Sequence, residues 1–196
     1  MSTDEKKKIS QFHHTIIIGS LLGNMHIQKT GANTEKCRLR FSHSIKQKKY
    51  VNWKYTVFEN QFCSKTKPPY KNARILKHSS QGEYIFYTEY ANEFSWYHST
   101  WYTKKIPVDE NEKLKYTYKK KIPDNILELL VDPVMLAIWY LDDGTKRNDC
   151  NACRLATQSF SEKENIMLQQ CLQTNFNLHV TIDKWKNKKL RSFYMV

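Results

Sequence analysis

Two short segments of the chain, separated by about half its length, follow the same pattern. Residues 17–25 (IIGSLLGNM) and residues 136–144 (LAIWYLDDG) are each an apolar run that leads directly into a turn with polar side chains. An apolar run without a charged face predicts a helix that is buried on more than one side. A chain with two such helices is expected to pack them side by side, which brings the polar residues at their ends together.

Those polar residues are Asn24 after the first run and the pair Asp142 and Asp143 after the second. Acidic groups gathered at a helix junction in a strongly basic chain suggest a metal site that faces phosphate. An Asp-Asp-Gly sequence alone is more often an ordinary helix-terminating turn. The repetition of the pattern is what favours a metal site.

The charge of the chain favours a polyanionic partner. Its 196 residues include 32 lysines and arginines against 19 aspartates and glutamates, which gives a net charge of +13. Together with 12 tyrosines, 9 phenylalanines and 5 tryptophans, this balance indicates nucleic-acid binding, although an ordinary basic protein would share the charge. The length is sufficient for one large domain or two small ones.

The cysteines do not predict a structural zinc site. Cys150 and Cys153 form a lone CxxC, and the other three cysteines are scattered singly, whereas such a site needs a second pair. We therefore expect reduced thiols in an intracellular protein. No apolar run approaches the ~20 residues of a membrane span, and the first residues match neither a signal peptide nor a transit peptide.

The order of the predicted elements repeats once. In the first copy, periodicity and turn signals predict alternating helices and strands over residues 10–23 (helix), 25–29 and 36–43 (strands), 47–62 (helix), 70–76 and 83–90 (strands) and 92–103 (helix). Residues 104–123, with two Ile-Pro pairs and a lysine run, are the best candidate for a linker. A short helix is expected at 124–130, with Asp124 placed to cap it.

The second copy begins at Asp132-Pro133, an N-cap followed by proline at the first helical position. Strands are expected at 145–149 and 153–158, and a capping box at Ser161 to Glu164 opens a helix to about residue 174. Two further strands are expected at 177–184 and 189–196. The unit is helix, strand pair, helix, strand pair, helix, and the second copy lacks its last helix.

With its paired motifs and repeated order of elements, the sequence resembles the single-chain, two-motif LAGLIDADG homing endonucleases, especially the omega type encoded in mitochondrial ribosomal RNA introns. The resemblance rests on two motifs, residues 17–25 and residues 136–144, the second followed by Thr145-Lys146-Arg147. It also includes residues 120–123 (KKIP) upstream of the second motif and residues 156–160 (ATQSF) downstream of it. It covers about residues 10–196. The resemblance implies an α+β fold of two pseudo-symmetric αββαββα halves, with antiparallel saddle-shaped sheets and the motif helices at the interface. The corresponding domains are 10–105, a linker and lead-in at 106–131, and 132–196.

The resemblance also implies the site. Asp143 is one metal-binding acid and Asn24 stands at the position of the other, while backbone carbonyls of Gly23 and Asp142 are expected to add ligands. Lys120 matches a basic residue near the scissile phosphate. Oxygen ligands suit Mg²⁺, with Mn²⁺ as an alternative and Ca²⁺ as an ion that could occupy the site without supporting cleavage. Two metal ions would clamp an in-line displacement at phosphorus.

The basic faces of the strands are expected to read double-stranded DNA in the major groove, where arginine and lysine suit guanine and glutamine and asparagine suit adenine. Some of these residues would contact only phosphate. The candidates are Gln28, Lys29, Arg38, Arg40, Ser42, Lys71, Arg74, Lys146, Arg147, Arg154, Gln158, Lys184 and Lys186.

Two features depart from the family pattern. Asn24 is neutral where an acid is expected, and Met25 replaces the usual small residue. We therefore expect a chain that binds its target but cleaves poorly or nicks one strand. The final helix of the family, with its second-site lysine, has no counterpart before Val196.

The leading interpretation is a monomeric, site-specific DNA endonuclease of intron-homing type, without a membrane partner. An organellar location, mitochondrial or alternatively chloroplast, follows from the resemblance and from a composition typical of AT-rich genes. An RNA-binding intron maturase on the same fold is the rival, and tight binding to intron RNA would distinguish it. A non-catalytic DNA-binding regulator is a third class, which Asp143 and Lys120 argue against.

Overall fold

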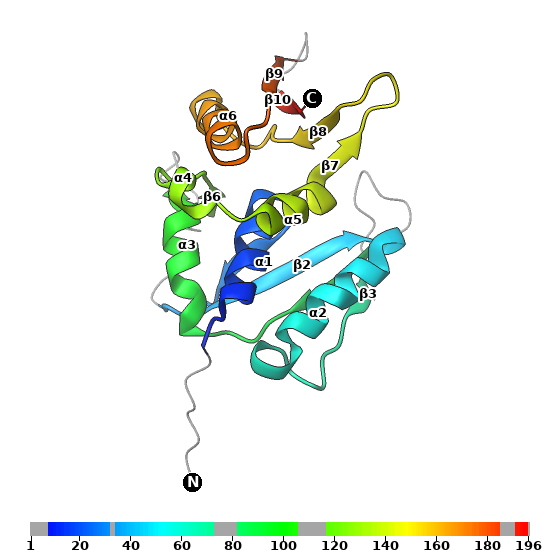
Figure 1. Ribbon diagram of the computed structural model, residues 1–196. Helices are drawn as coiled ribbons and strands as arrows, with labels where there is room; N and C mark the ends of the chain where they lie inside the picture. Colours follow the sequence, from blue (N-terminus) through cyan, green and yellow to red (C-terminus); the bar gives the residue numbers. More distant parts are fainter. Residues whose placement is uncertain (1–7, 32–33, 73–81, 106–116, 185–190, 196) are drawn as a thin grey trace, which may run out of the picture. The chain divides into compact units, whose positions relative to one another are not determined.

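The computed structural model describes residues 8–31, 34–72, 82–105, 117–184 and 191–195, and Figure 1 shows their arrangement into helices and strands. The chain forms two compact units. The first comprises Met1–Ile17 and Asn24–Ser99, and the second comprises Ile18–Gly23 and Thr100–Val196. Helix α1 (Gln11–Leu22) contributes residues to both. Among the described residues, no helix combines the length and the apolar character needed to cross a bilayer.

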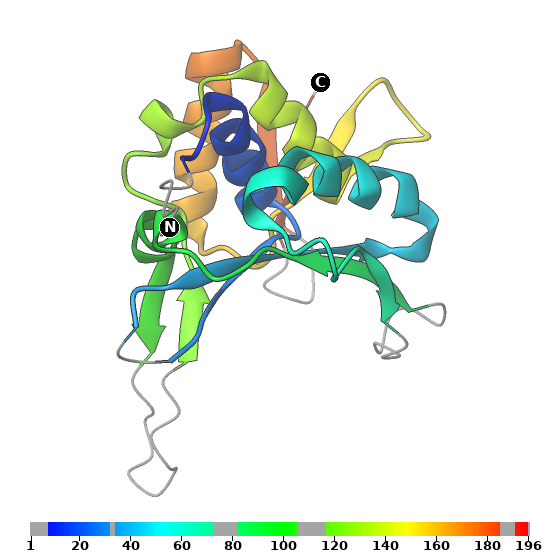
Figure 2. The same cartoon turned by 90° about the horizontal axis from the view of Figure 1, so that it is seen from below.

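The first unit is built on a four-stranded antiparallel sheet. Its strands are β1 (His26–Lys29), β2 (Cys37–Ser44), β3 (Tyr70–Asn72) and β4 (Glu83–Tyr87), in the order β1-β2-β4-β3. Helix α2 (Lys48–Phe62), which follows the 3₁₀ turn η1 (Ile45–Gln47), covers one face of this sheet (Figure 2). The turn η2 (Asn92–Phe94) and helix α3 (Ser95–Trp101) complete the unit up to Ser99.

Alternation along β2 decides where the core of this unit lies. Cys37, Leu39 and Phe41 are fully buried, as the sequence predicts. The Phe41 ring stacks on Phe86 of β4 with 4.7 Å between centroids and lies 5.3 Å from Phe58 of α2. Successive strand residues point to opposite faces, so Arg38 and Arg40 lie on the face away from α2.

The second unit holds the second motif helix and another four-stranded antiparallel sheet. The strands β7 (Gly144–Lys146), β8 (Cys153–Ala156), β9 (Val180–Lys184) and β10 (Arg191–Met195) follow the order β7-β8-β10-β9. Helices α4 (Ile126–Leu129), α5 (Pro133–Asp143) and α6 (Glu162–Phe176) accompany them. In both sheets the first strand of the second hairpin, β3 or β9, lies at the edge, and the second strand, β4 or β10, lies inside. The prediction of an α+β fold with antiparallel sheets is confirmed.

The local helix signals of this unit are largely confirmed. The Asp132 side chain accepts a hydrogen bond from the Val134 amide at 2.8 Å, and proline starts α5. The capping box of Ser161 and Glu164 is present at the start of α6. The prediction that Asp124 caps α4 is wrong. Asn125 is the N-cap residue of α4, and its side chain makes no capping hydrogen bond.

The prediction of a linker at residues 104–123 is wrong for 104–105 and 117–120, which belong to a strand pair, while 106–116 lie outside the described residues. Strand β5 (Tyr102–Lys105) pairs with β6 (Thr117–Lys120) in an antiparallel ladder that joins Tyr102 to Lys120. The aromatic helix therefore ends at Trp101, and the two residues after it belong to β5. The lysine run follows the strand into the segment before α4.

The end of α1 packs closely on α5, as the two apolar runs predict. A Cβ atom built on Gly19 would lie 2.5 Å from the Met135 carbonyl oxygen and 2.8 Å from the Ile138 Cβ. Real Cβ atoms do not approach backbone oxygen so closely, so only glycine allows this contact. The same closeness recurs at Gly23, one helical turn further on.

Candidate metal site and nucleic-acid interface

The ends of the two motif helices meet at Gly23 and Asp142. A Cβ atom on Gly23 would lie 2.4 Å from the Asp142 Cβ and 2.9 Å from its Oδ2. Asp142 is buried at 8% exposure, whereas Asp143, the last residue of α5, is half-buried. One carboxylate is thus enclosed against the backbone of the other helix, and the next one is accessible to solvent.

Lys120, at the end of β6, extends to the same place. Its Nζ donates to the carbonyl oxygens of Leu21 at 2.9 Å and Gly23 at 3.0 Å. Burial lowers the pKa of Lys120 to about 8, although the carboxylates of Asp143 and Asp142 act in the opposite direction. The last carbonyls of a helix have no intrahelical partner, and the ammonium group satisfies them here.

A carboxylate from α6 holds the chain just beyond Lys120. The Ile122 amide donates to Glu164 Oε1 at 2.9 Å, and the Ser161 amide donates to Glu164 Oε2 at 2.6 Å. Two backbone segments are therefore fixed by one side chain. This bridge helps to set where β6 ends and where the lysine points.

Four predicted site residues, Gly23, Lys120, Asp142 and Asp143, are gathered in this way in the second unit. Asn24 follows Gly23 directly in the chain, is exposed, and belongs to the first unit. The structure adds what the sequence does not indicate, namely that Lys120 binds the carbonyl of Gly23. The catalytic and metal-binding roles themselves stay predictions.

The chemistry of this cluster fits a hard divalent cation. The donors that a cation would meet are the carboxylate of Asp143, the carboxylate or carbonyl of Asp142 and the carbonyl of Gly23, which are all oxygen atoms as Mg²⁺ and Mn²⁺ prefer. Within the ranges that the structure describes, no three histidine, cysteine or acidic side chains form a metal cluster. The five cysteines are free thiols. Backbone oxygen and water would have to complete the coordination.

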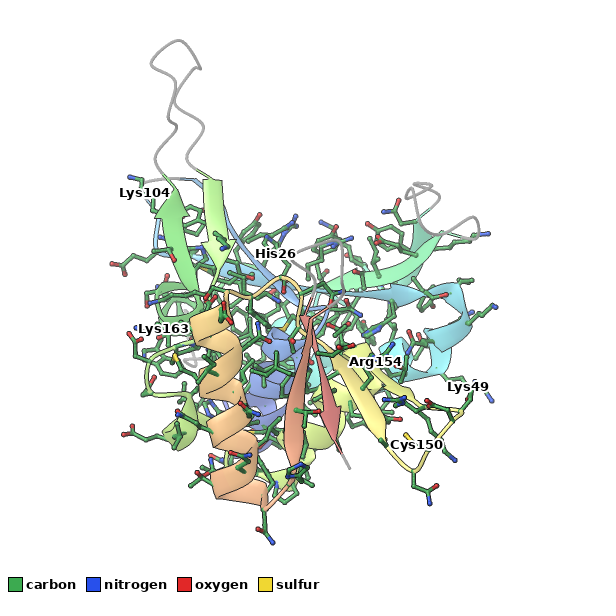
Figure 3. All side chains as sticks on the ribbon, turned by 90° about the horizontal axis from the view of Figure 1, so that it is seen from above. His26, Lys49, Lys104, Cys150, Arg154 and Lys163 are labelled. Atoms are coloured by element: carbon green, nitrogen blue, oxygen red, sulfur yellow. The ribbon has the colours of Figure 1, made fainter. Side chains whose placement is uncertain are left out.

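Four side chains of the first unit, His26, Gln28, Arg38 and Arg40, form a polar row on the open face of the sheet. Gln28 pairs with Arg38 across β1 and β2, and His26 pairs with Arg40. The Arg38 Nε donates to Gln28 Oε1 at 3.0 Å, and an Arg40 Nη donates to Glu83 Oε2 at 2.8 Å. Alternation from Gln28 would have identified His26, which is exposed beside Arg40 (Figure 3).

Two predicted interface residues lie on the other face of the sheet, and a third is buried. Lys29 pairs with Cys37, and Lys71 pairs with Tyr84, which in turn pairs with His43. Directly paired residues share a face, so both lysines lie on the face that carries the core. Ser42 is on the open face but is only 8% exposed, which leaves little of it for a ligand.

In the second unit, the predicted residues are divided between the two faces of the sheet. Arg154 of β8 pairs with Thr145, whereas Lys146 pairs with Cys153 and so points to the opposite face. Figure 3 shows Arg154 on β8 and Cys150 in the turn that precedes it. Arg147 forms an ion pair with Asp149 in that turn, and the Arg147 hydrogen bond holds the pKa of Asp149 at about 2.

The remaining candidates lie outside the strands, or their side chains lie outside the described residues. Gln158 is exposed in the turn after β8 rather than within the strand. Arg74 and Lys186 lie outside the described residues, as does the side chain of Lys184.

The oxygen donors and the lysine thus lie together on an α+β fold with antiparallel sheets. The sequence matches the model of the LAGLIDADG DNA endonuclease family over residues 14–196. The chain therefore belongs to that family.

The chain is similar to two known proteins whose names give different roles. The chain is 27% identical to DNA endonuclease I-ChuI of Chlamydomonas applanata over 179 residues, which are 90% of this chain and 78% of that protein. It is 28% identical to the cytochrome b mRNA maturase bI2 of Saccharomyces cerevisiae over 171 residues, which are 87% of this chain and 38% of the maturase. The chain thus spans well under half of the maturase.

Solved structures show the same fold. The homing endonuclease I-WcaI bound to its DNA recognition sequence aligns with a TM-score of 0.72 and 22% identity, covering 100% of this chain and 84% of that one. I-DmoI in complex with DNA and Mn aligns with a TM-score of 0.51 and 10% identity, covering 93% of this chain and 88% of the other.

Proposed function

We propose that this chain is a site-specific, metal-dependent endonuclease of the intron-homing type that recognises a long asymmetric site in double-stranded DNA. The observation that carries the proposal is the cluster of Gly23, Lys120, Asp142 and Asp143, in a chain of this family with a net charge of +13. A basic chain attracts the phosphate backbone, and the cluster offers an acid, a carbonyl and an ammonium group where phosphodiester chemistry needs them.

In this proposal each residue of the cluster has a separate role. Asp143 and the carbonyl of Gly23 hold a divalent cation with Asp142, and Asn24 stands at the second acid position. The cation, when bound, would offset negative charge on the phosphate oxygens. Lys120 donates to the phosphate or orders the attacking water, through the same ammonium group that binds the carbonyls of Leu21 and Gly23.

We further propose that the chain contacts DNA in the way that the family resemblance implies. Residues 10–105 and 132–196 form two pseudo-symmetric halves of a monomer, and each half contacts the duplex through its saddle-shaped sheet. Arg38, Arg40, Gln28 and Arg154 read or position the DNA. The support is the polar row on the open sheet face and the likeness to I-WcaI, described with its DNA recognition sequence. The proposed location is the mitochondrion, where an intron-encoded protein with cytochrome b mRNA maturase relatives would be made.

Asn24 weakens cleavage in this chain. A neutral amide can donate a carbonyl oxygen to a cation but brings no charge to hold it. We expect the chain to bind a defined duplex site and to cleave it poorly or in one strand, and Asn24→Asp to cleave both strands. The measurement is incubation of both forms with a randomised duplex library and Mg²⁺, followed by sequencing of bound and cleaved products.

The matched control is the double variant Asn24→Asp/Asp143→Asn, which should select the same site without cutting it. Efficient cleavage of both strands by the unaltered chain would contradict the role given to Asn24. If no form selects a duplex site, the endonuclease proposal fails as a whole.

A specific observation favours a second function, that of an RNA-binding intron maturase. The chain aligns over 87% of its length with a cytochrome b mRNA maturase, and an RNA-splicing role does not require the second acid. Binding to structured intron RNA that exceeds binding to any duplex DNA, together with inactivity of Asn24→Asp, would establish this alternative.

A further inference from the structure

A pocket of about 1040 Å³ opens in the first unit, between the edge of the sheet and the loop that follows α2. Its walls include Arg38 of β2, Tyr70 of β3, Tyr87 at the end of β4, and Tyr90 and Lys67 from the adjoining segments. Of the described residues that line it, none belongs to the candidate metal site. The pocket therefore requires an explanation of its own.

Arg38 is held in a fixed orientation in this pocket. Its Cζ lies 4.3 Å from the ring centroid of Tyr87 and 4.8 Å from that of Tyr90. The bond from Nε to Gln28 Oε1 uses only one of the five N–H donors of the guanidinium. An arginine that is stacked and anchored in advance loses little rotamer freedom when it binds a phosphate through its terminal N–H groups.

Tyr70 offers an aromatic surface next to this guanidinium. Its side chain is 49% exposed and comes from the edge strand β3. Burial, and after it the neighbouring Tyr87 phenol, raises the pKa of Tyr70, so the phenol is neutral and does not repel an anion. An exposed ring beside a fixed cation is the arrangement that proteins use to stack a base and bind its phosphate.

The charges and rings of the pocket select among possible occupants. Arg38 and Lys67 outnumber the one acid on the wall, Glu89, which favours an anion. A methylammonium ligand is excluded because Arg38 already covers the rings of Tyr87 and Tyr90. A base inside a duplex has both faces covered by its neighbours, so only a base outside the helical stack can lie on Tyr70.

We propose that this pocket binds an unstacked nucleotide, with its base against Tyr70 and its phosphate held by Arg38 and Lys67. The nucleotide could come from single-stranded RNA or single-stranded DNA, which share this chemistry. The inference rests on the proposed function only in taking nucleic acid as the partner, and it adds an unpaired ligand to a face assigned to duplex DNA.

The test measures fluorescence anisotropy with three labelled probes of one mixed sequence: single-stranded RNA, single-stranded DNA and the DNA duplex. Tyr70→Ala should weaken binding of at least one single strand about tenfold, within the roughly 5- to 150-fold that one stacked base contributes. Tyr70→Phe keeps the ring and should retain the affinity. Trp53→Ala removes another exposed aromatic residue, on α2 and outside the pocket, and should change nothing.

A loss of affinity of Tyr70→Ala for single-stranded RNA, for single-stranded DNA or for both supports the proposal. The probe that is affected identifies the nucleic acid from which the bound nucleotide comes. Equal single-strand affinities of Tyr70→Ala and Tyr70→Phe, with both variants unfolding at the temperature of the parent chain, would overturn it. Selection of a duplex site is measured separately with the randomised library. Selection of a duplex site without an effect of Tyr70→Ala would contradict the pocket proposal and leave the endonuclease proposal standing. An effect of Tyr70→Ala without selection of a duplex site would support the pocket and contradict the endonuclease proposal.

Discussion

Gly19 shows how one residue controls the closeness of the motif helices. In a helix interior, replacing glycine with alanine usually stabilises by about 1 kcal/mol. At Gly19 the added Cβ would meet the Met135 carbonyl oxygen at 2.5 Å and the Ile138 Cβ at 2.8 Å, and backbone atoms cannot move aside as a flexible side chain can. The contact therefore outweighs the propensity.

We predict that Gly19→Ala lowers the free energy of unfolding by about 1–3 kcal/mol, the usual range for overpacking. Chemical denaturation measures it. Gly31→Ala is the control, because its Cβ would meet nothing nearer than the Thr34 Cγ2 at 4.0 Å, and it should stay within about 0.5 kcal/mol of the parent chain. An equal effect of both substitutions would show that helix packing is not the cause.

At the scale of elements, the N-cap of α5 fixes where the second motif helix begins. The Asp132 side chain accepts from the Val134 amide, one of the first amides that lack an intrahelical partner. Asp132→Ala should destabilise the fold by about 1 kcal/mol, measured by the shift of the denaturation midpoint. Asp124→Ala should have little effect, because Asp124 does not cap α4. A larger loss from Asp124→Ala would contradict the assignment of the caps.

Elements whose signals are local could be predicted from the sequence. Alternation from Cys37 to Phe41 identifies β2 and its buried face, and the capping box at Ser161 identifies the start of α6. The β5–β6 pair could not be found in the same way, because its two strands are separated along the chain and the lysine-rich composition of the second is typical of a linker. Pairing there depends on a distant partner rather than on local pattern.

The site was only partly predictable for a related reason. The motif and its resemblance located Asp143 and Lys120, but the bond from Lys120 to the Gly23 carbonyl depends on how β6 and the end of α1 meet. The faces of Lys29 and Lys71 depend on strand register, and a shift of one residue reverses every side chain. Sequence alone fixes the residue types but leaves the register open.

At the scale of the whole molecule, the net charge of +13 predicts binding that weakens steeply with salt. A protein that neutralises about 6–10 phosphates loses roughly 10³–10⁵ in affinity between about 50 and 200 mM salt. Arg154 is a candidate for one of these contacts, and Arg154→Gln should reduce the slope of log K against log salt by about one. Lys49→Gln should leave the slope unchanged, because Lys49 (Figure 3) lies on α2, which covers the core face of the first sheet, away from Arg38 and Arg40 (Figure 2).

The slope distinguishes two sources of affinity that a single measurement would combine. Phosphate contacts release counterions and so depend on salt, whereas a base stacked on Tyr70 adds an affinity that is largely independent of it. Titration of duplex and single-stranded probes at several salt concentrations should therefore give a steeper slope for the duplex and a larger salt-independent part for the single strand. A duplex affinity that does not change with salt would contradict the electrostatic basis of the proposed function, because lysines and arginines that bind phosphates release counterions and make the affinity depend on salt.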